Sequence, residues 1–245
     1  MIKVRDLTIG HDGVPIMEHL DFEVDRGDVF LILGGSGSGK STLLRHLIGL
    51  QQPMRGSIEL AGLGDPARAH GQRPSFGVMF QSGALFGSMT LAQNVALPLQ
   101  TWTDLDAATI ASVVGGTLRL VGLEGAGQRL PAELSGGMKK RAGIARALAL
   151  STDLLFLDEP SAGLDPISAA ELDELLLTLN RSLGLTLVIV THELESIYRI
   201  GSRCVLLDKR ARGILARGEP RRLRDTSADP YVRAFFNRRP LEARA

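Results

Sequence analysis

A glycine-rich stretch from residue 34 to residue 42 holds the residues best suited to chemistry. It reads GGSGSGKST and fits the pattern G-x-x-x-x-G-K-[ST] through Gly34, Gly39, Lys40 and Ser41. Glycines allow a tight turn whose N–H groups face phosphate oxygens. The lysine can neutralise β- and γ-phosphate charge, and the serine hydroxyl can ligate Mg²⁺. The predicted phosphate-binding residues are Gly34, Gly35, Ser36, Gly37, Ser38, Gly39, Lys40, Ser41 and Thr42.

The residues on either side of this stretch support that interpretation. The apolar run 29–33 precedes it and the apolar-rich run 43–48 follows it, which predicts a strand, a turn and a helix. A helix at this place would also direct the positive end of its dipole at the phosphates. The alternative is a flexible glycine turn that happens to contain a lysine, and it would not require these flanks.

Two acids follow another apolar run, Leu154 to Leu157. A carboxylate at the carboxyl end of a buried strand lies where ligands bind in an open α/β sheet. Asp158 is placed to hold Mg²⁺ through its water shell, and Glu159 can polarise an attacking water. Many strands end in an acid, so this pattern gains weight only beside a phosphate-binding loop.

Two further groups have both a structural and a functional interpretation. Ser135, Gly136 and Gly137 open the helical run 138–150, where they would form either a simple N-cap or an anion-binding helix start. His192 follows the apolar run 185–190, where it would be either a polar cap of a strand or a catalytic side chain. Taken alone, each pattern favours the structural interpretation.

The elements that must position these residues predict an α/β fold. Short, fully apolar runs suit parallel strands covered on both faces, and leucines and alanines spaced by three and four predict helices. We expect strands at 2–9, 16–24, 29–33, 57–60, 76–80, 154–157 and 185–190, a loop at 62–75, helical structure over 91–150 and a crossover helix at 167–183.

Composition limits the class of protein. The chain has 245 residues, 44% of them hydrophobic and 22% charged, without a run of 18 apolar residues or a signal-peptide h-region. Its single cysteine, Cys204, lies in an apolar run and is expected to be buried. These features predict a cytosolic protein. The net charge of +1 lacks the strong excess of basic residues that is typical of nucleic-acid-binding proteins.

The charge is unevenly distributed along the chain. Residues 201–245 carry twelve Lys or Arg and five Asp or Glu. This segment is either a solvated basic face or a surface that approaches anionic lipid headgroups or an acidic partner.

Taken together, these motifs resemble the ATP-binding subunits of ABC transporters over nearly all of residues 1–225. The resemblance implies a role for each matching residue. Residues 34–42 match Walker A, and residues 134–138 match the signature loop, which meets the γ-phosphate bound by the opposite subunit. Asp158 and Glu159 match Walker B and the catalytic base. Gln81 matches the Q-loop glutamine, which in that family reaches Mg²⁺ and the attacking water. Asp165 matches the D-loop aspartate, and His192 matches the switch histidine.

The resemblance also implies an architecture and a dimer. We expect a P-loop, RecA-like core with an antiparallel β lobe, residues 1–87 and 151–225, an inserted helical lobe, residues 88–150, and a short basic tail, residues 226–245. Two copies would bind ATP and Mg²⁺ head to tail. Each site would then combine Lys40, Ser41, Gln81, Asp158, Glu159 and His192 of one chain with Ser135 and Gly137 of the other.

One position departs from the family pattern. The aromatic residue that stacks on adenine is replaced by His11, which offers less π-surface. The alternative is that His11 is an exposed turn residue.

The residues 80–86, 134–149 and 229–237 are similar to the Mla-type subunits, which move phospholipid with MCE proteins between Gram-negative membranes. This likeness implies a peripheral subunit on the cytoplasmic face of the inner membrane. Its partners would be permease subunits, an MCE-type lipid-binding subunit and a small accessory subunit, without nucleic acid. The alternatives are the ATPase of an importer for a small solute such as an amino acid and, more distantly, a soluble ATPase of ribosomes or DNA repair.

Overall fold

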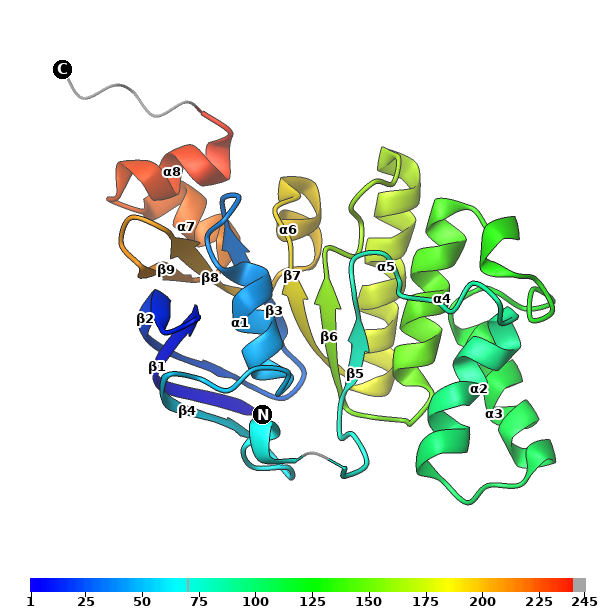
Figure 1. Cartoon of the computed structure of the whole chain (residues 1–245). Coiled ribbons are helices and arrows are strands. Elements are labelled where there is room, and N and C mark those ends of the chain that lie inside the picture. Colours follow the sequence, from blue (N-terminus) through cyan, green and yellow to red (C-terminus); the bar gives the residue numbers. More distant parts are fainter. Residues whose placement is uncertain (70, 240–245) are drawn as a thin grey trace. The chain divides into compact units, whose positions relative to one another are not determined.

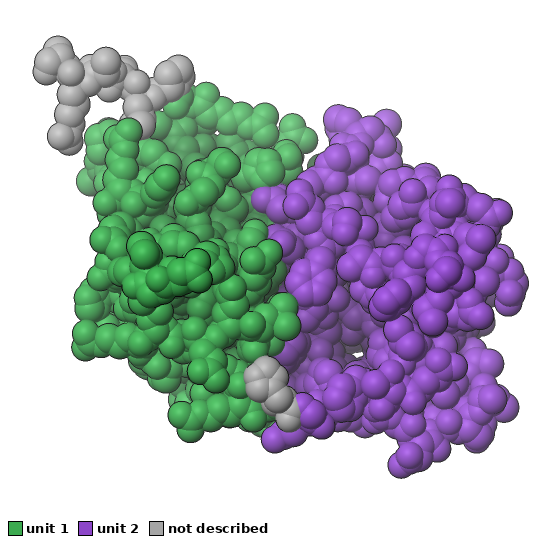
Figure 2. Space-filling view, viewed as in Figure 1, with its two compact units in different colours: residues 1–70, 188–245 green, residues 71–187 purple. Residues whose placement is uncertain are grey.

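The computed structural model describes residues 1–69 and 71–239. Its backbone forms two compact units, one of residues 1–70 and 188–245 and the other of residues 71–187. Figure 2 colours the first unit green and the second purple. We call them unit 1 and unit 2 and describe each by itself. Among the described residues, no helix is long and apolar enough to cross a membrane.

Unit 1 begins with a three-stranded antiparallel sheet, in the order β2-β1-β4. Its strands are β1 (Ile2–His11), β2 (Val14–Val24) and β4 (Arg55–Leu60). Asp12 and Gly13 turn the first two strands into a hairpin through positive φ angles of 50° and 77°. This sheet confirms the predicted antiparallel lobe.

The phosphate-binding loop of unit 1 is carried by a parallel pair of strands. β3 (Val29–Gly34) is buried along its whole length and pairs in parallel with β8 (Arg203–Asp208), which pairs antiparallel with β9 (Gly213–Gly218). α1 (Lys40–Leu47) follows the loop and turns four buried residues inward. The strand, loop and helix therefore occur in the predicted order (Figure 1).

Cys204 lies on β8 and is buried, as expected from its apolar neighbours. Desolvation by this burial raises the pKa of the thiol to about 12. The side chain therefore packs as a small apolar group.

Much of the basic C-terminal segment forms short helices. After α6 (Leu194–Ile200) and β9, the chain forms α7 (Pro220–Thr226) and α8 (Pro230–Asn237). Val232 and Phe236 of α8 are buried, and the Tyr198 hydroxyl donates a hydrogen bond to the Phe236 carbonyl. These two apolar residues, four apart, lie on one face of α8 and pack it against unit 1. Residues 240–245 of the expected tail lie outside the described residues.

Unit 2 combines two parallel strands with four α-helices. β5 (Gly77–Met79) pairs in parallel with β6 (Leu154–Asp158), so that Met79 lies opposite Leu157. The helices are α2 (Leu91–Trp102), α3 (Ala107–Leu120), α4 (Gly136–Leu148) and α5 (Pro166–Leu183). β7 (Thr186–Val190) then leads from unit 2 into unit 1.

Side-chain caps explain where the helices of unit 2 begin. Thr90 and Gln93 form a reciprocal capping box at α2. Asp106, Ser135 and Asp165 accept backbone hydrogen bonds at the starts of α3, α4 and α5. The predicted helical region 91–150 therefore contains three helices. The expected lobe boundaries at residues 88 and 150 remain predictions, because the compact units divide the chain at other residues.

Candidate functional site

The phosphate-binding loop of unit 1 needs glycine for steric reasons. Gly34, Gly37 and Gly39 have φ angles of 153°, 72° and 81°. A Cβ added at Gly34 would lie 2.3 Å from the Ser38 Oγ and 2.7 Å from the Leu207 carbonyl oxygen. The backbone thus forms a tight cradle that leaves no room for a side chain at Gly34.

Lys40 folds back over this cradle. Its Nζ donates hydrogen bonds to the carbonyl oxygens of Gly34 at 2.9 Å and of Gly35 at 3.0 Å. The first turn of α1 carries no acid, so the positive end of the helix is left for an anion. These features fit the phosphate groups of a nucleotide. The nine predicted residues, Gly34 to Thr42, lie in this loop and the first turn of α1.

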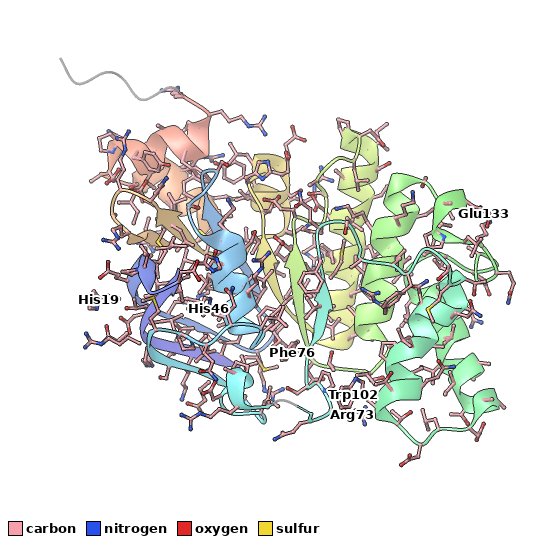
Figure 3. All side chains as sticks on the ribbon, viewed as in Figure 1. His19, His46, Arg73, Phe76, Trp102 and Glu133 are labelled. Carbon is pink, nitrogen blue, oxygen red and sulfur yellow. The ribbon has the colours of Figure 1, made fainter. Side chains whose placement is uncertain are left out.

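A buried histidine supports the loop from within α1. His46 is 1% exposed, and its Nδ1 lies 2.8 Å from the Thr42 carbonyl oxygen (Figure 3). Desolvation lowers the pKa of His46, so the ring is neutral at pH 7. It therefore braces the first turn without adding charge.

His192 lies at the same end of β3 as the loop. The N–H of Thr191 donates to the Ile32 carbonyl at 3.4 Å, and the Thr191 hydroxyl accepts a bond from the Glu193 N–H at 3.1 Å. The His192 side chain is 57% exposed and its Nε2 lies 3.6 Å from a Glu193 carboxylate oxygen. Unit 1 thus brings His192 to the edge that carries the phosphate-binding loop.

His11 ends β1 and is exposed, as both sequence interpretations require. Its Nδ1 lies 3.5 Å from the Gln51 Nε2, and its strand partner Val14 is 64% exposed. Gly39 of the loop lies against Ile16 and Met17 of the neighbouring strand. The hairpin that carries His11 therefore packs beside the phosphate-binding loop.

Unit 2 brings together the predicted acids and the Q-loop glutamine. Asp158 ends β6 and Gln81 lies two residues after β5, at the carboxyl ends of two paired parallel strands. Glu159 is 8% exposed and has a φ angle of 49°. Carboxylate and amide oxygens of this kind are the ligands that Mg²⁺ prefers.

The signature residues and the D-loop aspartate also lie together in unit 2. Ser135 caps α4, and a Cβ added at Gly136 would lie 3.4 Å from the Leu164 Cδ2, next to Asp165. Asp165 caps α5 by accepting the N–H groups of Ile167 and Ser168, both at 3.0 Å. Hydrogen bonds, first of all from the Ser168 side chain, hold the pKa of Asp165 below its ordinary value.

Comparison with known proteins identifies the family of the chain. The family model for ABC transporters matches residues 17–162. The chain is 39% identical over 242 residues to the intermembrane phospholipid transport system ATP-binding protein MlaF of Escherichia coli K12, covering 97% of this chain and 88% of that protein. It is 40% identical over 244 residues to a probable ribonucleotide transport ATP-binding protein, mkl, of Mycobacterium leprae, covering 98% and 70%.

The chain belongs to the ABC transporter family. It is an ATP-binding, ATP-hydrolysing subunit with the α/β fold of the family's cassettes. The dimeric, post-hydrolysis ATP-binding cassette MJ0796 with bound ADP and Pi superposes with a TM-score of 0.79 at 26% identity, covering 89% of this chain and 98% of that chain. The cassette cbiO1 of Clostridium perfringens, part of the ABC transporter complex cbiONQ, gives a TM-score of 0.81 at 30% identity, covering 90% of this chain and 88% of that chain.

Several residues of the ABC cassette escaped the sequence analysis. Lys140 and Arg146 of α4 donate to the carbonyls of Gln81 and Ala84. Asn94 of α2 accepts a hydrogen bond from the Phe86 N–H in the loop that follows. In unit 1, the Tyr231 hydroxyl of α8 would lie 3.7 Å from a Cβ on Gly35. Tyr231 follows Asp229 and Pro230, a cap and helix-start pair that a search for helix starts would find.

Proposed function

We propose that this subunit binds and hydrolyses MgATP. In unit 1, the amides of Gly34 to Gly39 and the Lys40 ammonium would hold the phosphates. Ser41 would supply a hydroxyl ligand for Mg²⁺, and His11 would stack on adenine. The glycine-rich turn supports this assignment, because Gly34, Gly37 and Gly39 have positive φ angles and a Cβ at Gly34 would clash with Ser38 and Leu207.

Unit 2 would supply the groups that act on water. Asp158 and Gln81 would complete the oxygen ligands of Mg²⁺, and the Glu159 carboxylate would accept the proton of the attacking water. His192 of unit 1 would hydrogen-bond the γ-phosphate as its charge develops. Mg²⁺ held by these residues would supply positive charge that neutralises the developing phosphate charge. The paired ends of β5 and β6 support the grouping of Gln81 with Asp158.

A second copy of the chain would complete each site. We propose a head-to-tail dimer in which Ser135, Gly136 and Gly137 of one copy meet the γ-phosphate held by the other, with Asp165 beside the junction. Ser135 and Gly136 are exposed at the start of α4, where backbone amides attract anions. The dimeric cassette MJ0796, described with ADP and Pi, supports this arrangement.

We propose phospholipid as the transported substrate, at the cytoplasmic face of the inner membrane, with permease, MCE-type and accessory subunits as partners. The observation that carries this proposal is the 39% identity to MlaF over 97% of the chain. A second candidate is a small-solute importer. A methionine import ATP-binding protein, MetN of Lacticaseibacillus paracasei, is also 39% identical, over 85% of this chain.

Purification of the native complex tests the substrate. Its subunits and bound lipids would be identified by mass spectrometry, and ATP-dependent transfer of a fluorescent phospholipid between membranes would be compared with methionine uptake. We expect phospholipid in the complex and transfer that Lys40→Ala abolishes. Methionine uptake without lipid transfer would establish the importer instead.

An apolar groove in unit 2 is the proposed docking site of the permease. It encloses about 340 Å³, and its walls include Phe76, Val78, Phe86, Leu97, Pro98 and Trp102. Figure 3 labels Phe76 and Trp102, which come from the start of β5 and the end of α2. Phe86 is 52% exposed at its rim. A short cytoplasmic helix with apolar residues on one face would fit such a groove.

A further inference from the structure

Lys140 is a buried lysine that the proposed chemistry does not use. It lies on α4, five residues after Ser135, and is 7% exposed. Its Nζ donates one hydrogen bond to the Gln81 carbonyl at 2.6 Å and another to the Glu159 carbonyl at 3.0 Å. Burying an ammonium group is costly unless hydrogen bonds compensate it. Its position between the backbones of two proposed site residues therefore requires an explanation.

The acceptor at Glu159 belongs to a residue in a strained conformation. Glu159 has a φ angle of 49°, in the left-handed region that side chains other than glycine seldom adopt. Such a conformation persists where surrounding contacts hold it. The bond from Lys140 to the Glu159 carbonyl acts on this peptide, so it helps to fix the direction in which the Glu159 side chain leaves the backbone.

The same helix holds a second strained residue. Ala84 has a φ angle of 47°, and its carbonyl accepts a hydrogen bond from Arg146 Nη1 at 2.7 Å. Arg146 Nη2 also donates to the Gly83 carbonyl at 3.2 Å. Two basic side chains of α4 thus each bind the carbonyl of a left-handed residue, one beside the acids and one in the Q-loop.

Close packing keeps α4 against the Q-loop between these two side chains. A Cβ added at Gly143 would lie 3.2 Å from the Gly83 Cα and 3.2 Å from the Met79 Cγ. The helix and the loop therefore approach so closely that a side chain at residue 143 would crowd the loop. A movement of α4 would carry Gln81 with it, because Lys140, Gly143 and Arg146 all contact residues 79–84.

We propose that Lys140 is a positioning residue that fixes the backbones of Gln81 and Glu159 relative to each other. By this restraint, α4, which Ser135 caps, would orient the Glu159 carboxylate, the proposed base for the attacking water. The link to catalysis rests on the proposed function of Glu159, whereas the restraint on the two backbones does not.

Hydrogen exchange in the full chain measures the restraint directly. The Gly83 N–H is bonded to the Phe80 carbonyl, and the Ala162 N–H is bonded to the Glu159 carbonyl, so these amides report on the two loops. In Lys140→Met, which keeps the length of the side chain, we expect both amides to exchange about tenfold faster or more, the factor for losing a hydrogen bond from a charged donor. Lys139→Met is the matched control, and both amides should exchange there at the parent rate.

Turnover in the assembled complex measures the consequence for catalysis. Lys140→Met should lower kcat by about tenfold or more, for the same reason, while nucleotide affinity stays within about twofold of the parent. Lys140→Gln keeps two N–H donors and should recover part of both the exchange protection and the turnover.

Three outcomes would overturn the proposal: unchanged exchange at both amides in Lys140→Met, equal loosening in Lys139→Met, or a Lys140→Gln variant no better than Lys140→Met. The Glu159→Gln variant separates the two proposals. If it hydrolyses ATP at the parent rate, the role of Glu159 is wrong, and the exchange measurements still decide whether Lys140 restrains the backbones.

Discussion

Among single residues, Glu159 is the one on which the proposed chemistry depends most. Glu159→Gln keeps the size of the side chain and removes its basic carboxylate. We expect ATP binding to survive and turnover to fall by about 10²-fold or more, the upper part of the range for losing a general base. ATPase rates of the assembled complex, together with nucleotide affinity, check this result.

Lys40→Ala is the contrasting variant for Glu159→Gln. Lys40 donates to the Gly34 and Gly35 carbonyls of the cradle, so its loss should weaken nucleotide binding itself. Near-parent turnover in Glu159→Gln would exclude Glu159 as the base. Unchanged affinity in Lys40→Ala would exclude the phosphate-binding role of that lysine.

Asn94 carries a stability prediction. It is fully buried, its Oδ1 accepts from the Phe86 N–H at 2.8 Å, and its Nδ2 donates to the carbonyls of Phe86, Met89 and Thr90 at 3.0 to 3.2 Å. Asn94→Ala should leave these groups unsatisfied and cost about 2 kcal/mol, or about 4–8 °C in the unfolding midpoint. Calorimetry checks the shift, and the exposed Gln100→Ala on the same helix should stay within about 1 °C or 2 °C. Equal midpoints for both variants would contradict the role of Asn94.

Sequence analysis found the residues that belong to a recognisable motif. It missed the residues whose role depends on tertiary contacts. Lys40 stands out because its neighbours are glycines and a serine. Lys140 stands in the run Lys139-Lys140-Arg141, which looks like an ordinary solvated face. Its burial depends on residues 81 and 159, far away in sequence, and no local pattern encodes such a contact.

At the scale of elements, the groove beside the Q-loop gives a binding prediction. Phe86 is held at its backbone by Asn94, and the residue is 52% exposed at the rim of the groove. Buried aromatic anchors commonly cost about 2 kcal/mol or more when truncated. Phe86→Ala should therefore weaken co-purification with the permease or uncouple hydrolysis from transport, with nucleotide affinity of the isolated subunit unchanged.

Leu120→Ala is the matched control for this groove. Leu120 ends α3, is 49% exposed and does not line the groove, so its truncation should leave complex yield and transport as in the parent. Normal yield and normal transport in Phe86→Ala would remove Phe86 from the interface.

The elements that the sequence predicted well have strong local patterns. β3, β6 and β7 are short apolar runs, and α5 begins at Asp165 and Pro166 and ends at Gly184, which are standard start and stop signals. The C-terminal elements were harder to predict. β9 is only half-buried, and α7 contains three arginines, so neither has a periodic apolar pattern. Their placement depends on contacts with β8 and with each other.

At the scale of the whole molecule, the proposed dimer gives a prediction about assembly. Ser135→Arg places a long charged side chain where the second copy would meet the γ-phosphate. We expect turnover to be abolished and ATP binding to the loop of Lys40 to be retained. Light scattering should show an ATP-dependent dimer in Glu159→Gln, with or without the permease, and no such dimer when Ser135→Arg is added.

A helix cap complicates this variant and requires a control. The Ser135 hydroxyl accepts the Met138 N–H at 3.2 Å, and losing such a cap costs about 1 kcal/mol. Ser135→Ala loses the cap without adding bulk or charge, so it should retain much more turnover than Ser135→Arg. Loss of ATP binding equal to the loss of turnover would argue against a role across the dimer.

The burial of Cys204 makes the native chain usable for distance measurements by site-specific labelling. With a pKa of about 12, only about one part in ten thousand of this thiol is ionised at pH 8, and maleimides react with the thiolate. The chain therefore behaves toward such reagents as if it had no cysteine. A cysteine introduced at an exposed position of each unit would carry a fluorophore or a spin label, and the pair would follow the separation of the units through the ATP cycle.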